Sequence, residues 1–353
     1  MGITHGGDIY SFGDAEALDF SANINPLGLA PGVREAILRS VDMCVNYPDP
    51  LCRKLKKSIA EWEDVPQDGI VCGNGAADVI FRLVQAVRPK KALLLAPTFS
   101  EYECALRAAG CRCVFYTLRE ENGFALGEDI LEHIHPGLDM VIICNPNNPT
   151  GGLVSPGLMR RILEKCAEMN AMLVADECFN DFLDEPDKYT MKPYLQEYSN
   201  LFILKAFTKL FAIPGLRLGY GLAGNTRVID GVFRQGQAWS VSVPAQEAGA
   251  AAVQEKEYVR QTREVVRAER EYLKNSLQAF GCTVYGSQAN YVFFKAPGGA
   301  GLQEYLKQKR ILIRSCANYR GLGSEFFRIA VRLREQNELL VDAMGGYFKN
   351  GDR

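Results

Sequence analysis

The chain has 353 residues, of which 47% are hydrophobic, and its 40 Lys and Arg nearly balance its 42 Asp and Glu. Such a chain can bury one large core or two unequal ones, and no block of like charge gives it the basic surface that nucleic acid requires. No apolar run approaches the roughly 20 residues of a membrane helix, and the N-terminus lacks the apolar core of a secretion signal. We therefore expect a cytoplasmic protein that binds neither nucleic acid nor membrane.

The eleven cysteines are odd in number and scattered along the chain. Their one close pair, Cys111 and Cys113, is separated by a single residue, which fits neither the usual redox spacing nor the usual zinc spacing. We expect reduced thiols and no metal site.

The first thirty residues are rich in glycine, asparagine and proline, which predicts an N-terminal arm rather than a core element. From about residue 69 to 222, short apolar segments alternate with amphipathic ones, as in parallel βαβ units. The predicted strands cover residues 69–72, 92–96, 111–116, 140–144, 172–175, 201–204 and 216–221, and the predicted helices cover 76–87, 100–109 and 156–169. This pattern predicts an α/β fold with a large, doubly wound, mostly parallel seven-stranded sheet, whose ligands bind beyond the carboxyl ends of the strands.

After Pro244 a long helical pattern extends to Phe280 and is followed by short strands and two helices. This change of character predicts a second, smaller α+β domain. We place the arm, which joins the small domain, at residues 1–30, the large domain at 31–235 and the small C-terminal domain at 236–353.

Residues 73–78 read Gly-Asn-Gly-Ala-Ala-Asp, between a predicted strand and a predicted helix. Backbone N–H groups at such a helix start can receive a phosphate. A nicotinamide dinucleotide site would need a small residue at Asp78 and would normally open the first βαβ unit. A phosphate cradle is therefore favoured, with a dinucleotide site and a simple tight turn as the alternatives.

Polar residues also follow two neighbouring strands. Residues 145–151 read Asn-Pro-Asn-Asn-Pro-Thr-Gly directly after the strand 140–144, where a loop faces a ligand or forms an ordinary proline and asparagine turn. Asp176 ends the next strand, so its carboxylate points from an apolar strand tip toward the same crevice. A buried carboxylate needs a partner, and a protonated pyridine nitrogen would be one.

Residues 205–220 place Lys209 and Arg217 in an otherwise almost uncharged, apolar run. An ammonium kept out of water titrates downward and becomes a nucleophile. Because the chain turns at Pro214 and Gly215, the lysine and the guanidinium should end near one another. This pair suits a carbonyl cofactor that carries a phosphate.

In this order, residues 73–78, 145–151 and 205–220 with Asp176 resemble a pyridoxal-phosphate-dependent fold-type I enzyme of the class I/II aminotransferase superfamily, over nearly the whole chain. The resemblance implies that the catalytic Lys209 forms a Schiff base with pyridoxal 5'-phosphate and that the catalytic Asp176 holds the ring nitrogen. It further implies ring contacts from Asn148, Phe99 and Phe179, phosphate contacts from Gly75, Ala76, Ala77, Thr208 and Arg217, and a homodimer in which Tyr47 reaches the partner subunit's phosphate.

Within this superfamily the chain resembles two groups, the threonine-phosphate decarboxylases of cobalamin biosynthesis and the histidinol-phosphate aminotransferases. The segments 5–7, 20–28, 47–50, 97–102 and 211–220 resemble the decarboxylases. Phe179 stands where the aminotransferases usually carry a tyrosine whose hydroxyl contacts the cofactor. We expect decarboxylation of L-threonine O-3-phosphate to (R)-1-amino-2-propanol O-2-phosphate, with transamination of histidinol phosphate or a related amino acid as the alternative.

A phosphorylated amino acid needs cationic and amide partners. The candidates for substrate binding are His5, Asn25, Asn148, Arg314 and Arg328, while Arg320 and Arg332 are further arginines for which surface ion pairs are the alternative. Which of these groups takes the phosphate and which the carboxylate stays open.

Overall fold

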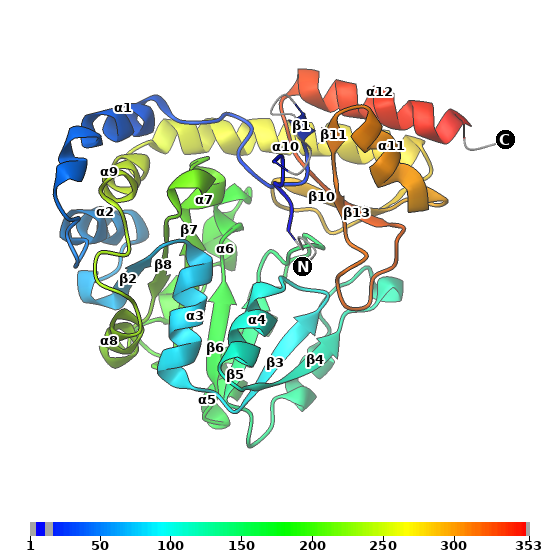
Figure 1. The fold of residues 1–353 in the computed structure, drawn as a ribbon. Helices are drawn as coiled ribbons and strands as arrows, with labels where there is room; N and C mark the ends of the chain where they lie inside the picture. Colours follow the sequence, from blue (N-terminus) through cyan, green and yellow to red (C-terminus); the bar gives the residue numbers. More distant parts are fainter. Residues whose placement is uncertain (1–4, 11–16, 351–353) are drawn as a thin grey trace.

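The computed structural model describes residues 5–10 and 17–350, which form two lobes (Figure 1). The large lobe is built on a seven-stranded sheet in the order β2 (Ile70–Gly73), β8 (Gly219–Leu222), β7 (Leu201–Ala206), β6 (Met172–Asp176), β5 (Met140–Cys144), β3 (Lys91–Ala96) and β4 (Arg112–Thr117). All neighbouring strands run parallel except β8, which is antiparallel to both β2 and β7. The predicted α/β fold with a mostly parallel seven-stranded sheet is confirmed.

Helices cover both faces of this sheet. One face carries α3 (Ala76–Val87), α4 (Glu101–Ala108) and α8 (Thr226–Arg234), and the other carries α2 (Arg53–Glu63) and α5 (Pro156–Glu168). Alternate residues of one strand enter opposite apolar clusters, as Ile142 and Ile143 of β5 do. Because both faces are buried, the strands read as continuous apolar runs, which explains why the sequence located them well.

The small lobe is an antiparallel sheet covered by helices. Its strands are β12 (Arg314–Ser315), β13 (Phe326–Ala330), β10 (Tyr291–Lys295) and β9 (Thr283–Tyr285), and its helices are α10 (Lys256–Ala279), α11 (Leu302–Gln308) and α12 (Arg334–Asn350). The N-terminal segment joins this lobe, since β1 (Leu18–Asp19) pairs in parallel with β11 (Ile311–Leu312) and Phe20 lies in the same apolar cluster.

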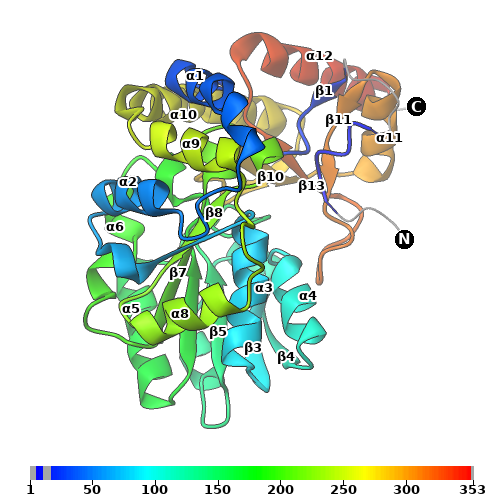
Figure 2. The same cartoon turned by 60° about the vertical axis from the view of Figure 1, so that its left-hand side comes forward.

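The long helix α10 runs from one lobe to the other (Figure 2). Before it, α9 (Val243–Ala252) packs against α1 (Pro31–Ser40) and α2. The remaining short helices are α6 (Pro186–Tyr189) and α7 (Phe207–Leu210). The domain boundaries at residues 30 and 235 stay predictions.

The strand predicted at residues 216–221 begins later, at Gly219. Residues Pro214–Leu216 form a 3-10 turn instead, and Arg217 has a left-handed backbone with φ of 56°. An extended strand cannot pass through that conformation. The turn matters because it brings Arg217 back toward the start of α3.

None of the described helices combines the length and the hydrophobicity of a membrane-spanning helix. The described residues also contain no cluster of three or more His, Cys, Asp or Glu side chains that could bind a metal ion.

Candidate active site

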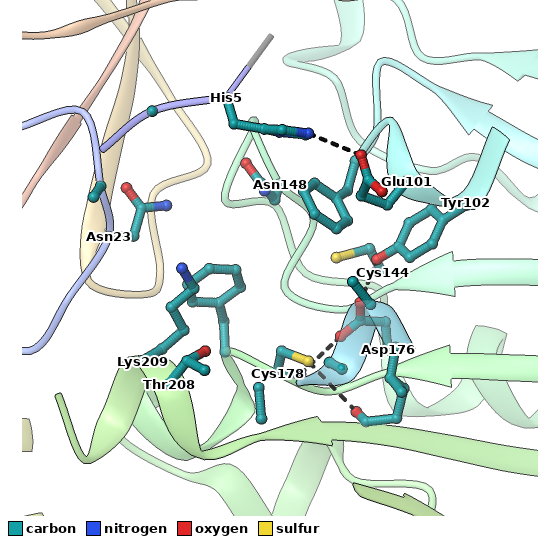
Figure 3. A pocket seen from close by; sticks show the side chains of 18 of the residues that line it. His5, Asn23, Glu101, Tyr102, Cys144, Asn148, Asp176, Cys178, Thr208 and Lys209 are labelled. Carbon is teal, nitrogen blue, oxygen red and sulfur yellow. Dashed lines mark hydrogen bonds and ion pairs between the residues drawn. The ribbon is translucent and has the colours of Figure 1, made fainter. Parts of the chain in front are cut away.

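A cavity of about 610 Å³ lies between the two lobes, beyond the carboxyl ends of β5, β6 and β7 (Figure 3). Twelve of the residues singled out in the sequence line it: His5, Ala76, Ala77, Phe99, Asn148, Asp176, Phe179, Thr208, Lys209, Arg217, Arg314 and Arg328. The edge of the sheet thus gathers side chains from the arm, the large lobe and the small lobe.

Lys209 stands on α7, directly after β7, and its side chain enters the cavity (Figure 3). Its Nζ makes no hydrogen bond or ion pair with any described residue. Removal from water lowers the pKa of Lys209 to about 8, and the positive charges of Arg328 and Arg217 act in the same direction. At pH 7 about a tenth of this amine is uncharged and nucleophilic, a far larger share than in an ordinary lysine.

Asp176 ends β6 at the opposite side of the cavity and is only 5% exposed. Its Oδ1 accepts a hydrogen bond from Cys178 N at 2.9 Å, and its Oδ2 accepts one from the Tyr102 hydroxyl. Burial raises the pKa of Asp176, while these donors lower it. None of the described cations pairs with the carboxylate, so the site fits a ligand that brings a positive charge there.

The loop from β2 into α3 forms a cradle beside Arg217. Gly75 has φ of 95°, and a Cβ on it would lie 2.5 Å from Arg217 Nη2. A Cβ on Gly219 would lie 2.3 Å from Ala76 N. Both positions therefore need glycine, which lets the guanidinium approach the first N–H groups of α3. A helix start beside a guanidinium fits a phosphate.

Arg328, on β13, is 5% exposed and reaches the cavity from the small lobe. Its Nη1 donates to Asn148 Oδ1 and its Nη2 donates to Ser21 O at 2.7 Å. Its Nε is buried and has no hydrogen-bond partner among the described residues. One guanidinium thus joins the arm, the loop after β5 and the small lobe.

The cavity mouth is formed by Arg314 and His5. Arg314 Nη2 donates to Asn318 Oδ1 at 2.7 Å, and the guanidinium lies 5.4 Å from the centre of the Tyr319 ring. His5 Nε2 lies 2.8 Å from Glu101 Oε1.

The sequence predicts that Asn25 binds substrate, but its side chain does not line the cavity. Its amide donates to Leu210 O at 2.6 Å and to Thr262 Oγ1 at 2.7 Å, and its carbonyl oxygen accepts from Leu27 N. The side chain therefore fixes the arm to α7 and α10. The lining residue of this segment is Asn23, whose Oδ1 is buried without a partner among the described residues.

Two of the four candidate arginines lie outside the cavity. Arg320 pairs with Glu103 at 3.4 Å and lies 4.1 Å from the centre of the Phe115 ring. Arg332 Nε donates to Asp19 O at 2.9 Å. Arg314 and Arg328 are thus left as the cavity's small-lobe cations among the described residues.

Tyr47 also lies away from the cavity lining of its own chain. It is 78% exposed and stacks on Trp239 at 4.5 Å between ring centres. The sequence patterns did not predict four further lining residues, Asn23, Glu101, Tyr102 and Tyr319. The segments 20–28 and 97–102 contained the first three, but residue order alone does not show which side chains face a cavity.

A family model described as aminotransferase class I and II matches residues 15–344. The chain belongs to this family, and it is a pyridoxal-phosphate-dependent enzyme. The site fits that cofactor, because a phosphate cradle, an amine of lowered pKa and a buried carboxylate without a cation border one cavity.

Among individual proteins, the chain is similar to the threonine-phosphate decarboxylase of Salmonella typhimurium, with 37% identity over 96% of this chain and 95% of that protein. The structure is similar to that of the histidinol-phosphate aminotransferase from Clostridium acetobutylicum, with a TM-score of 0.88, 31% identity and coverage of 94% of this chain and 99% of that one. It is also similar to that of the L-threonine-O-3-phosphate decarboxylase from Porphyromonas gingivalis, with a TM-score of 0.82, 25% identity and the same coverage of 94% and 99%.

Proposed function

We propose that the protein is a decarboxylase of L-threonine O-3-phosphate that releases carbon dioxide and (R)-1-amino-2-propanol O-2-phosphate, a step of cobalamin biosynthesis. The observation that carries this proposal is the meeting of Arg314, Arg328 and His5 in the cavity that holds Lys209. Threonine phosphate presents a carboxylate and a phosphate on one molecule, whereas histidinol phosphate presents a phosphate alone and its amino acceptor presents carboxylates alone. The similarity to the Salmonella decarboxylase supports the same choice.

The same geometry supports the cofactor contacts that we propose. Gly75, Ala76, Ala77, Thr208 and Arg217 hold the phosphate, and Asn148, Phe99 and Phe179 contact the ring. Asn148 is suited to this role because Arg328 occupies its carbonyl oxygen and leaves its amide free to donate. Phe179 has no hydroxyl to offer there.

When bound, pyridoxal 5'-phosphate supplies a sink for the electron pair that a broken bond leaves on the substrate's Cα. Asp176 stabilises a positive charge on the ring nitrogen, and its Tyr102 and Cys178 donors keep the carboxylate in place. Lys209 would hold the cofactor at its aldehyde carbon and, once the substrate amine has displaced it, would deliver a proton to Cα. Its lowered pKa suits both tasks.

Arg328 and Arg314 differ in burial, and this difference supports a different role for each guanidinium. Arg328 is deep in the cavity beside Asn148, so it binds the substrate carboxylate bidentately. Arg314 is partly exposed at the mouth, where it binds the phosphate together with His5. Asn23 provides a further polar contact on the arm side.

We infer that two copies associate through an apolar surface around Tyr47. Several large apolar side chains are exposed on α1, on the 3-10 turn Asp42–Val45 and near Trp239: Leu38 62%, Val41 57%, Met43 46%, Val45 86%, Tyr47 78% and Trp239 47%. Such a patch marks a protein interface. In the homodimer Tyr47 reaches the phosphate in the partner's site. We also propose that the protein is cytoplasmic, as the sequence predicts.

The deciding experiment supplies the purified holoenzyme with L-threonine O-3-phosphate in the absence of any amino acceptor. We expect release of carbon dioxide without formation of a 2-oxo acid, and none from Lys209→Ala. Turnover that requires 2-oxoglutarate and yields glutamate would instead establish an aminotransferase, for which the similarity to the Clostridium acetobutylicum structure is the specific support.

A further inference from the structure

A histidine and a glutamate meet across the mouth of the cavity. Glu101 is the first residue of α4 in the large lobe, and its Oε1 lies 2.8 Å from Nε2 of His5 in the arm (Figure 3). The His5 ring also lies against Phe99, with 5.8 Å between ring centres. We call this contact the His5–Glu101 clasp.

The arm end of the clasp is fixed to the small lobe. Gly7 N donates to Ser21 Oγ at 2.8 Å, and a Cβ on Gly6 would lie 2.2 Å from Ser21 O. That same carbonyl oxygen accepts from Arg328 Nη2. The backbone that carries His5 is therefore packed against the group that holds the proposed carboxylate anchor, so the clasp links Arg328 to α4.

A carboxylate is an unexpected neighbour for an anionic substrate. Glu101 lines the cavity together with Arg314 and Arg328, and its side chain is only 22% exposed. A negative charge there repels a substrate that carries a carboxylate and a phosphate, unless it does something that outweighs the repulsion. The interaction that the structure shows for this carboxylate is its contact with His5.

His5 has two ring nitrogens, and Glu101 occupies one of them. No described residue bonds to the other, Nδ1. A carboxylate that holds one nitrogen of an imidazole fixes the orientation of the ring and directs the other nitrogen. Without Glu101, a histidine near the start of an arm would be free to swing into solvent, since its side chain is 44% exposed.

We propose that Glu101 is a positioning residue: it holds His5 across the cavity mouth so that the imidazolium donates from Nε2 to Glu101 and from Nδ1 to the phosphate of the substrate. This role rests on the proposed function in one respect, that the substrate carries a phosphate. Both candidate substrates do.

The test compares Glu101→Ala with Glu103→Ala, its matched control on the same helix. Glu103 pairs with Arg107 at 2.7 Å and with Arg320 at 3.4 Å and does not line the cavity. For the phosphorylated substrate that the unaltered enzyme turns over, Glu101→Ala should raise KM about tenfold with kcat within about twofold, since only uniform binding is lost. Glu103→Ala should change neither.

Two further variants separate positioning from charge. Glu101→Gln should recover part of the KM, because its amide oxygen still accepts a hydrogen bond from His5. In a His5→Ala background, Glu101→Ala should add less than about a twofold change, because residues that act as one unit are not additive. A KM that falls on removal of Glu101 would overturn the proposal, as would additive effects of the two substitutions.

Amide hydrogen exchange of residues 5–10 in the holoenzyme gives a readout independent of turnover. Exchange should be faster in Glu101→Ala and unchanged in Glu103→Ala. If the unaltered enzyme turned over neither threonine phosphate nor histidinol phosphate, the proposed function would fail, and equal exchange in Glu101→Ala and the unaltered enzyme would overturn the clasp separately.

Discussion

Lys209 and Asp176 depart from their ordinary pKa values in opposite directions, and burial is the largest cause for both. A buried amine loses its proton more readily and a buried carboxyl holds it more tightly. Each is thereby displaced toward its uncharged form, and each lacks a charged partner among the described residues. A ligand with an aldehyde and a basic ring nitrogen satisfies both, which is the residue-level reason that the cofactor fits.

The lowered pKa of Lys209 predicts how the apoenzyme takes up pyridoxal 5'-phosphate. The uncharged amine predominates above a pH of about 8, so the uptake rate should rise through that value rather than near the ordinary lysine value of about 10.4. Stopped-flow absorbance from pH 6 to 10 measures it, with Lys209→Ala as the blank. A midpoint above about 10 would contradict the burial of this amine.

Gly75 predicts a defect confined to the phosphate cradle. Gly75→Ala places a Cβ 2.5 Å from Arg217 Nη2 at a φ of 95°, which costs about 1–3 kcal/mol and should weaken cofactor binding about 10- to 100-fold. Absorbance titration of the apoenzyme measures the dissociation constant. Gly157→Ala in α5 is the control, since nothing lies within 4 Å of its added Cβ. Equal affinity in both variants would show that the cradle does not bind the phosphate.

At the scale of elements, apolar patterning located the strands of the seven-stranded sheet because their residues are buried on both faces. Apolar patterning does not reveal the ion-pair or hydrogen-bond partners of a polar side chain, because tertiary packing decides them. Lys205 belongs to the same apolar run as Lys209, yet its side chain does not line the cavity. It pairs instead with Asp181 at 2.9 Å and with Glu63 at 3.4 Å. Asn25 and Asn23 illustrate the same limit, because Asn25 donates to Leu210 O in α7 and to Thr262 Oγ1 in α10, while Asn23 lines the cavity.

The buried ion cluster under β7 predicts a stability effect. Lys205→Met leaves Lys192 as the remaining cation beside Glu63 and removes the cation that pairs with Asp181, so the free energy of unfolding should fall by about 3 kcal/mol. Lys188→Met, which removes an exposed pair with Glu185, should cost at most about 0.5 kcal/mol. Urea unfolding of both variants at one protein concentration measures the difference. Equal losses would show that the cluster is not coupled to the fold.

Glu177, at the other side of the β6 end from Asp176, predicts a pH dependence. Burial raises the pKa of Glu177 to about 7, so the folded state binds a proton that the unfolded state has released between pH 4.5 and 7. Stability therefore falls as pH rises through that window. Glu177→Gln removes this loss, so the variant should gain about 2 kcal/mol relative to the unaltered protein between pH 5 and 8. A difference independent of pH would contradict the raised pKa.

For the whole molecule, the exposed patch around Tyr47 predicts that one copy completes the site of the other. Lys209→Ala should be inactive and Tyr47→Ala should bind the cofactor weakly. In a mixed dimer the site with Lys209 receives Tyr47 from its partner, so random mixing should restore about a quarter of full activity. Refolding the variants together and apart measures this, with sedimentation equilibrium to verify the dimer. An inactive mixture would place Tyr47 in its own subunit's function.

The strand order also determines when, during synthesis, each strand of the sheet can pair with its neighbour. Ile70–Gly73, which leads into the cradle at Gly75, stands at the edge of the sheet and pairs with Gly219–Leu222. During synthesis it leaves the ribosome first and waits for every other strand of the sheet before its own partner appears. An unpaired apolar strand is exposed throughout that interval, when chaperones and aggregation compete for it. Within the seven-stranded sheet, the strand that is made first is therefore the strand whose pairing is completed last.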